Sequence, residues 1–288
     1  MTATMLSPSM AGAELAALPE PASLAQGFCQ ALRDIQTMTV RYVLRAARQP
    51  DLIIGSVLMP VIFVVLFGYV FGSAIHVPGG HYRTYLLSGL FAQTTLFSAS
   101  SVAVAVATDM SEGVIDRFRT MPIARSAVLL GRTIATLITG LPSLGVMIGC
   151  ALLVGWRPDA GLASAVAGFA MLALFGFSMS WIGALLGMIA RSPQSADALS
   201  MLPAFLLGFV SNVFVPIGGL PAWLRVFAEW NPLSAVVAAA RQMFGTPQAA
   251  TGGSWPLQHP VPVTIGMGVL LLALLIPVTV RRYSRPVA

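Results

Sequence analysis

Long apolar stretches alternate with short polar segments along most of the chain, and six of these stretches are about 20 residues long. A helix of about 20 apolar residues crosses the roughly 30 Å hydrocarbon layer of a bilayer. The pattern therefore predicts an all-α integral membrane protein with six transmembrane helices within residues 52–280. The predicted spans cover residues 52–71, 85–108, 133–155, 162–190, 199–215 and 261–280.

The composition supports a membrane protein. Hydrophobic residues make up 57% of the chain and charged residues only 9%, whereas about 25% of the residues of soluble globular proteins are charged. This balance excludes a soluble enzyme, a DNA-binding domain and a disordered protein, because so apolar a chain must face lipid over much of its surface. The net charge of +6 does not indicate a nucleic-acid partner, since arginines that flank membrane spans give the same sum.

The basic residues predict the orientation. All 16 are arginines, a bias that, with the abundance of Ala and Gly, indicates a GC-rich bacterial genome. Twelve of them fall before span 1, between spans 2 and 3, or after spans 4 and 6, and only Arg83, Arg157, Arg225 and Arg241 fall on the other side. Because cytoplasmic segments carry the excess of basic residues, both termini are predicted to be cytoplasmic in a multi-pass protein of the bacterial plasma membrane.

The chain before the first span divides into two parts. Residues 1–27, rich in Ala, Pro and Ser, are predicted to be a disordered cytoplasmic tail. Residues 28–50 have apolar positions at helical spacing on one side and arginines on the other, namely Arg33, Arg41, Arg45 and Arg48. This pattern predicts an amphipathic helix in the membrane interface, with its guanidinium groups toward the lipid headgroups. The alternative is a charged lead-in to the first span.

Sequence patterns typical of catalysis or metal binding are absent. The chain has no GxxxxGK[ST] loop for a nucleotide phosphate, no HExxH and no GxSxG. The three histidines fall in predicted extracytoplasmic loops, and we expect no metal site there. No acidic residue or histidine lies deep in a predicted span, and Arg132 is close enough to a span end to extend toward water. We therefore expect neither an enzyme nor a cofactor bound by this chain.

The segment DMSEGVIDRFRTMPIARS, between spans 2 and 3, carries the densest polar pattern. Asp109 and Glu112 have the spacing of a capping box at a helix start, and Pro122 predicts that the helix ends at the preceding residue. An apolar face of Val114, Ile115, Phe118 and Met121 lies beside a polar face of Asp116, Arg119 and Thr120. A helix over 109–122 with these faces suits docking into a groove on another protein. The pattern alone leaves open a loop that only fixes the topology.

The stretch EGVIDRFRTMPIARSAVLLGR closely resembles the cytoplasmic loop of type-2 ATP-binding-cassette (ABC) permeases, especially the daunorubicin/doxorubicin-exporter permease family. That family has a Glu-Gly pair, an arginine-rich helix, and a proline followed by an arginine. The matching residues here are Glu112, Gly113, Arg117, Arg119, Pro122 and Arg125. An interfacial N-terminal helix, six spans and an Asn-Pro element after span 5 also resemble the family. The resemblance covers roughly residues 28–283 and implies one type-2 transmembrane domain over 28–288.

The resemblance implies an export permease without a nucleotide-binding domain of its own. Two permease subunits, identical or paralogous, would dimerise, and separate ABC ATPase subunits that bind ATP and Mg would dock on their cytoplasmic faces. Residues 109–122 would be the coupling helix, seated in a cleft on the ATPase. The implied coupling residues are Glu112, Gly113, Val114, Ile115, Asp116, Arg117, Phe118, Arg119, Pro122 and Arg125. The cargo would be a hydrophobic or amphipathic drug, antibiotic, lipid or glycolipid.

Two other classes of protein stay open. A membrane enzyme that acts on lipid would need a nucleophile or an acid–base pair, and the spans offer no plausible one. A membrane anchor that holds an ATPase without transporting anything would fit the same cytoplasmic loop.

The segment between spans 5 and 6, residues 216–260, is too long for a plain connection. Apolar residues recur at helical spacing twice in it, which predicts two short re-entrant or interfacial helices. The segment resembles the extracytoplasmic gate of the family, including the pair Asn231 and Pro232. The alternative is a lid anchored by aromatic residues without a gating role.

Spans 2 and 5 carry mixed aromatic and uncharged polar faces that suit the pathway of an amphipathic cargo, and in the resembled family these spans line it. The candidate residues are Gln93, Phe97, Ser100 and Ser101 in span 2, and Phe205, Phe209 and Asn212 in span 5. The alternative is that they serve helix packing. Glycine pairs with GxxxG spacing, at 68/72, 145/149 and 183/187, are interpreted as close helix contacts.

Overall fold

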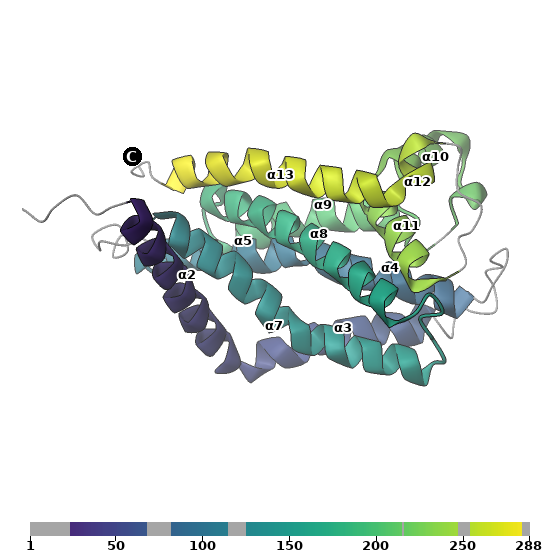
Figure 1. The fold of residues 1–288 in the computed structure, drawn as a ribbon, viewed down its shortest axis with the longest axis horizontal. Coiled ribbons are helices and arrows are strands. Elements are labelled where there is room, and N and C mark those ends of the chain that lie inside the picture. The colour runs from purple at the N-terminus through teal and green to yellow at the C-terminus, as the bar shows by residue number, and fades with distance from the viewer. Residues whose placement is uncertain (1–23, 68–81, 115–124, 215, 247–253, 284–288) are drawn as a thin grey trace, which may run out of the picture.

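The computed structural model describes residues 24–67, 82–114, 125–214, 216–246 and 254–283, and every regular element in these ranges is a helix. The long helices run roughly along one axis, and the short helices α10–α12 gather at one end (Figure 1). The α-helices are α2 Leu24–Ala47, α3 Pro50–Val65, α4 Tyr82–Leu96, α5 Ser98–Ser111, α7 Arg125–Leu153, α8 Leu162–Ile189, α9 Pro193–Phe209, α10 Ala222–Trp230, α11 Pro232–Phe244, α12 Trp255–Gln258 and α13 Pro260–Tyr283. A 3-10 turn, η2, covers Ile217–Gly219.

Four helical stretches in the described part of the chain are long and apolar enough to cross a membrane: Tyr82–Ser111, Ser126–Leu153, Leu162–Ile189 and Pro260–Tyr283. They coincide with predicted spans 2, 3, 4 and 6. At the positions of spans 1 and 5 the structure has α3 and α9, with 16 and 17 residues, or about 25 Å of helix each. The all-helical membrane protein agrees with the sequence prediction, and the count of six spans stays a prediction.

Span 2 is longer than predicted and is interrupted once. It runs from Tyr82 to Ser111, with a single non-helical residue, Phe97, between α4 and α5. Hydroxyl groups crowd this point: Thr94, Thr95 and Ser98 each donate to the carbonyl three residues earlier, at 2.7–2.8 Å. Such bonds compete with the backbone ladder of a helix, which accounts for a break here rather than elsewhere in the span.

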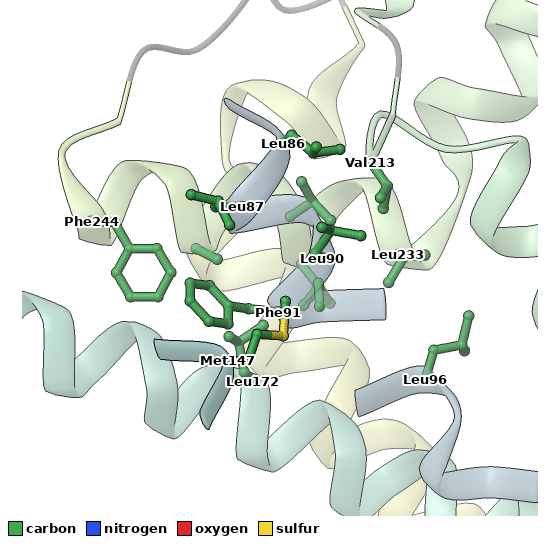
Figure 2. Packing of buried hydrophobic residues seen from close by; sticks show 14 of the residues in the cluster. Leu86, Leu87, Leu90, Phe91, Leu96, Met147, Leu172, Val213, Leu233 and Phe244 are labelled. Carbon is green, nitrogen blue, oxygen red and sulfur yellow. The ribbon is translucent and has the colours of Figure 1, made fainter. Parts of the chain in front are cut away.

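Helix α4 lies at the centre of the packed helices. In the apolar part of Tyr82–Ser111, 61% of the residues are buried, compared with 11% in Ser126–Leu153 and 17% in Pro260–Tyr283. Its side chains Leu86, Leu87, Leu90 and Phe91 pack among residues of α7, α8 and α11 (Figure 2). The ring of Phe91 lies 5.4 Å from the ring of Trp156. The outer helices α7 and α13 thus leave most of their apolar surface for lipid or for another subunit.

Of the two glycine pairs that the structure describes, only Gly183 and Gly187 make the close contact that was predicted. A Cβ on either residue would collide with a backbone carbonyl of α5, that of Ala99 or that of Ala103. The prediction is wrong for Gly145 and Gly149, where a Cβ would meet nothing within 4 Å. The pair at 68/72 lies outside the described residues.

The predicted amphipathic helix is present as α2, but it begins at Leu24, so residues 24–27 are helical and do not belong to a disordered tail. Met38 and Tyr42 are buried on its inner face, where α2 packs against α7. Residues 1–23 lie outside the described part. Between α9 and α13 the chain forms α10 and α11, at the two positions where short helices were predicted. Their place relative to the membrane stays a prediction.

Candidate functional site

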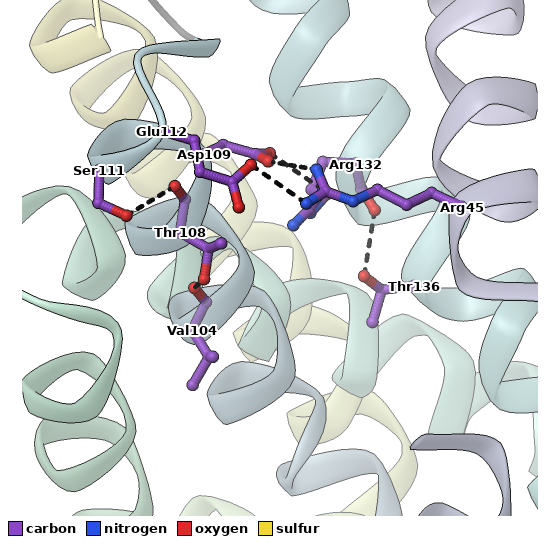
Figure 3. Close-up of polar contacts among 8 residues, drawn as sticks. All are labelled: Arg45, Val104, Thr108, Asp109, Ser111, Glu112, Arg132 and Thr136. Carbon is purple, nitrogen blue, oxygen red and sulfur yellow. Dashed lines mark hydrogen bonds and ion pairs between the residues drawn. The ribbon is translucent and has the colours of Figure 1, made fainter. Parts of the chain in front are cut away.

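Three helices are joined by a cluster of charged side chains, which we call the ionic junction: Arg45 of α2, Asp109 and Glu112 at the end of α5, and Arg132 of α7 (Figure 3). Arg45 donates to Oδ1 of Asp109 at 3.0 Å and to Oε2 of Glu112 at 3.3 Å. Arg132 approaches the other carboxylate oxygen, Oδ2 of Asp109, at 3.1 Å. Each oxygen of Asp109 therefore faces a different arginine, and charge-assisted bonds of this kind are roughly twice as strong as neutral ones.

The prediction that Asp109 caps the coupling helix is wrong. Asp109 lies in the last turn of α5, with its carboxylate turned toward the two arginines, and α5 continues to Ser111. Glu112 is the C-cap residue, and Gly113 follows with φ +68°, a left-handed conformation that glycine adopts without strain. The chain thus turns at the Glu-Gly pair and is helical again at Val114.

Arg132 does not extend toward water as predicted. Its side chain is only 12% exposed, because it points inward to Asp109, and its guanidinium carbon lies 4.3 Å from the centre of the Tyr42 ring. Burial, with a smaller contribution from the charge of Asp109, raises the pKa of Tyr42 to about 12. The phenol therefore stays protonated at neutral pH, and the junction carries two positive and two negative charges.

Most of the predicted coupling segment lies outside the described residues. This applies to Ile115, Asp116, Arg117, Phe118, Arg119 and Pro122, while Arg125 is described only as the first residue of α7. Val114 is partly buried against the cluster around Met38 and Tyr42, so its side chain faces inward. The ionic junction and Val114 together fix where this segment leaves α5.

Several of the predicted pathway residues meet between α5 and α9. The rings of Phe97 and Phe205 are 5.5 Å apart in an edge-to-face contact, and the rings of Phe205 and Phe209 are stacked at 6.1 Å. Ser100 donates to Asp197 on α9 at 2.6 Å, while Ser101 is exposed. Gln93 is buried against Gly208 of α9, and its Oε1 has no hydrogen-bond partner.

Asn212 departs from the predicted face. Helix α9 ends at Phe209, so the spacing that placed Asn212 beside Phe205 and Phe209 does not continue. Its amide nitrogen donates instead to the carbonyl of Ser234 at 3.3 Å, and the side chain is buried under α11. The interpretation of Asn212 as a residue on that face is wrong, because a helical period was extended past the end of the helix.

Sequence reasoning missed that the phenylalanines form a continuous row. From Phe209 the row continues to Phe214 at 5.3 Å and then to Phe67 of the α3 end at 4.6 Å. Phe63 stacks on Phe67 at 5.7 Å. Two pairs in this row have i,i+4 spacing, which was the signal available in the sequence. Phe209 is 55% exposed, so part of the row is open at the surface of the subunit.

Arg241 was predicted only as one of four arginines on the extracytoplasmic side, yet it is buried, with 2% of its surface exposed. Its guanidinium donates to the carbonyls of Tyr85 at 3.0 Å and Asn212 at 2.9 Å, and it lies 3.4 Å from the centre of the Tyr85 ring. Within the described ranges no carboxylate forms an ion pair with it. The signal in the sequence was a single arginine inside the apolar run SAVVAAARQMF.

Comparison with the sequences of known proteins shows the family to which the chain belongs. Residues 33–244 match the family described as ABC-2 type transporter. The chain belongs to the ABC-2 type transporter family. It is 33% identical over 234 residues to the daunorubicin resistance ABC transporter permease protein DrrB1 of Streptomyces coeruleorubidus, covering 81% of this chain and 80% of that protein.

More distant relatives of this ABC-2 chain include the doxorubicin resistance ABC transporter permease protein DrrB of Mycobacterium tuberculosis, which is 29% identical over 239 residues, with 78% of this chain and 82% of that protein covered. The putative transport permease ycf38 of Pyropia yezoensis is 22% identical over 224 residues, with 75% of each chain covered. The resemblance read from the cytoplasmic loop is confirmed. The family match includes the ionic junction, the row of phenylalanines and Arg241.

In this ABC-2 chain Asn231 and Pro232 connect two helices. Asn231 caps the start of α11, where its Oδ1 accepts from the backbone N–H of Leu233 at 2.9 Å, and Pro232 is the first residue of the helix. The amide nitrogen of Asn231 donates to the carbonyls of Leu207 and Val210 at the end of α9, both at 2.8 Å. The side chain of Asn231 thus forms hydrogen bonds with a free N–H at the start of α11 and with free carbonyls at the end of α9. Its role in a gate stays a prediction.

No group of three or more His, Cys, Asp or Glu side chains gathers in the described part of the ABC-2 chain in a way that could hold a metal ion. His76 and His81 lie outside this part. Cys29 and Cys150 are both free thiols.

Proposed function

We propose that the chain is the membrane-spanning permease subunit of an ATP-driven exporter that moves a hydrophobic or amphipathic cargo out of a bacterial cell. A separate ATPase subunit, which binds ATP and Mg, supplies the energy. A second permease subunit, identical or paralogous, completes the transporter. The family match supports a permease, and the relatives named for daunorubicin and doxorubicin resistance favour a drug or antibiotic over a lipid as cargo.

The ionic junction carries the proposal for coupling. It ties the ends of α2, α5 and α7 together at the residue from which the 112–125 loop leaves α5. A push on this loop by an ATPase would therefore reach three helices at once, because the junction resists separation of their ends. Glu112 would transmit the movement, since it is both in the loop and bonded to Arg45.

Phe118→Ala tests the docking of the ATPase. Phe118 is the largest apolar side chain of the segment, so its loss removes a central anchor and lowers affinity by about 30-fold if the anchor contributes about 2 kcal/mol. We expect normal membrane expression but weak co-purification of the partner ATPase. The matched control is Phe227→Ala on α10, where the side chain is 67% exposed, and it should leave co-purification unchanged.

Glu112→Ala separates coupling from binding. The ATPase should still co-purify, while ATP hydrolysis no longer rises when cargo is added. Export at the wild-type rate in both Phe118→Ala and Glu112→Ala would show that the loop only sets the topology. ATPase binding without any cargo movement by the wild-type chain would instead identify a membrane anchor.

For the pathway we propose the face between α5 and α9, with Phe97, Phe205 and Phe209 in contact with cargo. Two observations support this proposal. The row of phenylalanines is only partly buried, and two polar side chains, Ser100 and Asp197, lie beside it. Phe209→Ala should change the order in which a set of compounds is exported, because it removes an aromatic contact worth about 0.5–1.5 kcal/mol to an aromatic cargo. Binding of the ATPase subunit to the permease should not change. An unchanged export profile would contradict the assignment of Phe209 to the pathway.

A further inference from the structure

The face of α2 that points away from α7 carries a shallow groove of about 570 Å³. Its lining residues are Thr37, Val40, Arg41, Leu44, Arg45, Arg48 and Gln49, which recur at helical spacing along one stripe. Val40 and Leu44 are 50% and 53% exposed. Helix α2 runs at an angle to the long helices and lies at the end of the molecule where α13 ends (Figure 1).

The stripe combines two properties that neither water nor hydrocarbon alone would favour. Exposed Val40 and Leu44 are unfavourable in water, and Arg41, Arg45 and Arg48 are unfavourable in hydrocarbon. The boundary between headgroups and acyl chains accepts both, because apolar side chains reach the acyl chains while guanidinium groups stay among the headgroups. None of the lining residues is acidic. The charge of Arg45 is balanced by Asp109 and Glu112, so Arg41 and Arg48 give the groove its positive charge.

We propose that this groove binds the headgroup of an anionic phospholipid. The arginines would contact its phosphate, since the planar fork of guanidinium donors matches phosphate oxygens, and Val40 and Leu44 would contact the first carbons of its acyl chains. A lipid without net charge fits less well, because its own cation would lie against the three arginines.

Arg45 connects this groove to the ionic junction. One of its terminal nitrogens donates to Asp109 and the other to Glu112, yet the side chain is still 42% exposed toward the groove. A guanidinium has five N–H donors, so two carboxylates do not exhaust its capacity. A bound phosphate would share Arg45 with Glu112. The lipid would thus lie next to the point where the 112–125 loop leaves α5, whether or not the chain exports a cargo.

The experiment measures lipid retention by the purified full chain, using native mass spectrometry after incubation with phosphatidylglycerol or phosphatidylcholine. The test variant is Arg41→Gln/Arg48→Gln. The matched control is Arg281→Gln/Arg282→Gln, which removes the same charge from two exposed arginines at the end of α13. Each basic residue near an anionic lipid changes binding by about fivefold. Because Arg41 and Arg48 each contribute this factor, we expect the wild type to retain phosphatidylglycerol about 25-fold better than phosphatidylcholine.

This preference should disappear in Arg41→Gln/Arg48→Gln and persist in the control. Arg41→Lys/Arg48→Lys should restore most of it, because lysine also binds phosphate as a point charge, and this variant shows that the helix is intact. Equal retention of both lipids by the wild type would overturn the proposal. Equal losses in the two glutamine variants would also overturn it, because they would attribute the preference to the net charge of the chain.

Discussion

Arg132 and Arg241 are both largely withdrawn from solvent, at opposite ends of the α4–α5 helix pair, but their partners differ in kind. Arg132 shares the carboxylate of Asp109 with Arg45, and Glu112 adds a second negative charge. Among the described residues, Arg241 contacts backbone carbonyls and the face of the Tyr85 ring, and it has no carboxylate partner. The first arrangement cancels formal charges, whereas the second relies on dipoles and on the ring quadrupole.

The two arrangements differ in whether one arginine can be removed while another still contacts the same acceptor groups. In the ionic junction two arginines share one carboxylate, so one arginine can be removed while the other still neutralises it. Arg241 donates to the carbonyls of Asn212 and Val213, which follow the C-terminal end of α9. The hydroxyl of Tyr85, at the start of α4, adds a neutral hydrogen bond to the carbonyl of Asn212 at 2.8 Å. That end of a helix carries a partial negative charge, which favours a cation. The junction therefore keeps one arginine at the shared carboxylate when the other is lost, whereas no second cation in the described part of the chain donates to the carbonyls that Arg241 contacts.

The largest effect is expected for Arg241→Leu. It removes the charge-assisted bonds from the guanidinium to the carbonyls of Tyr85, Asn212 and Val213. The Tyr85 hydroxyl still donates to Asn212, but the loss of several bonds of this kind is expected to cost about 3–5 kcal/mol. The free energy of unfolding, measured by SDS titration in mixed micelles, should fall by this amount. Arg225→Leu is the control, because Arg225 also donates to a carbonyl, that of Gly218, but is exposed; it should cost under about 0.5 kcal/mol. Similar losses in both variants would contradict the comparison.

A smaller loss is expected for Asp109→Asn. The amide keeps the shape and one acceptor but leaves Arg45 and Arg132 without a shared negative charge, at a cost of about 1.5–3 kcal/mol. The same titration measures it, and Asp197→Asn is the control, since that carboxylate is exposed and accepts from a neutral serine. A greater loss for Asp109→Asn than for Arg241→Leu would reverse the assignment of redundancy.

The sequence predicts the positions of the helices better than it predicts the contacts of individual polar side chains. Apolar periodicity was enough to place α2, because that helix turns one apolar face inward over many turns. The length of the apolar stretches was enough to place α7, α8 and α13. The interpretation of Asp109 failed because its spacing to Glu112 satisfies a local rule, while the partners that decide its role, Arg45 and Arg132, are distant in sequence. Nothing in a capping pattern reports on a long-range ion pair.

Arg241 and Asn212 show a second limit. The excess of arginine predicts on which side of a membrane a segment lies, but it does not distinguish an arginine in water from one that folds back into the protein. Asn212 was placed on a helix face by extending a period, and the sequence contains no clear stop signal between Phe209 and Asn212. In both cases the burial is set by α11, which returns over the end of α9.

The smallest effect is expected for Arg45→Gln. Arg132 still neutralises Asp109, and the pair between Arg45 and Glu112 is roughly half exposed on both sides, so the loss should be about 0.5–1 kcal/mol. It should shrink further as salt is raised, because salt screens exposed pairs. The control is Arg33→Gln, also exposed on α2, which should cost less than Arg45→Gln at low salt. A loss above 2 kcal/mol would show that the two arginines are not interchangeable.

The glycine contact between α8 and α5 limits which parts of the protein can rearrange. At Gly183 and Gly187 the two backbones are too close to admit even a methyl group, so sliding one helix along the other would bring a side chain against the carbonyls of Ala99 or Ala103. These helices therefore have few relative degrees of freedom and form one mechanical element. Any transition of the subunit must be accommodated elsewhere, at joints such as Phe97 or the turn after α9, where the chain is not locked backbone to backbone.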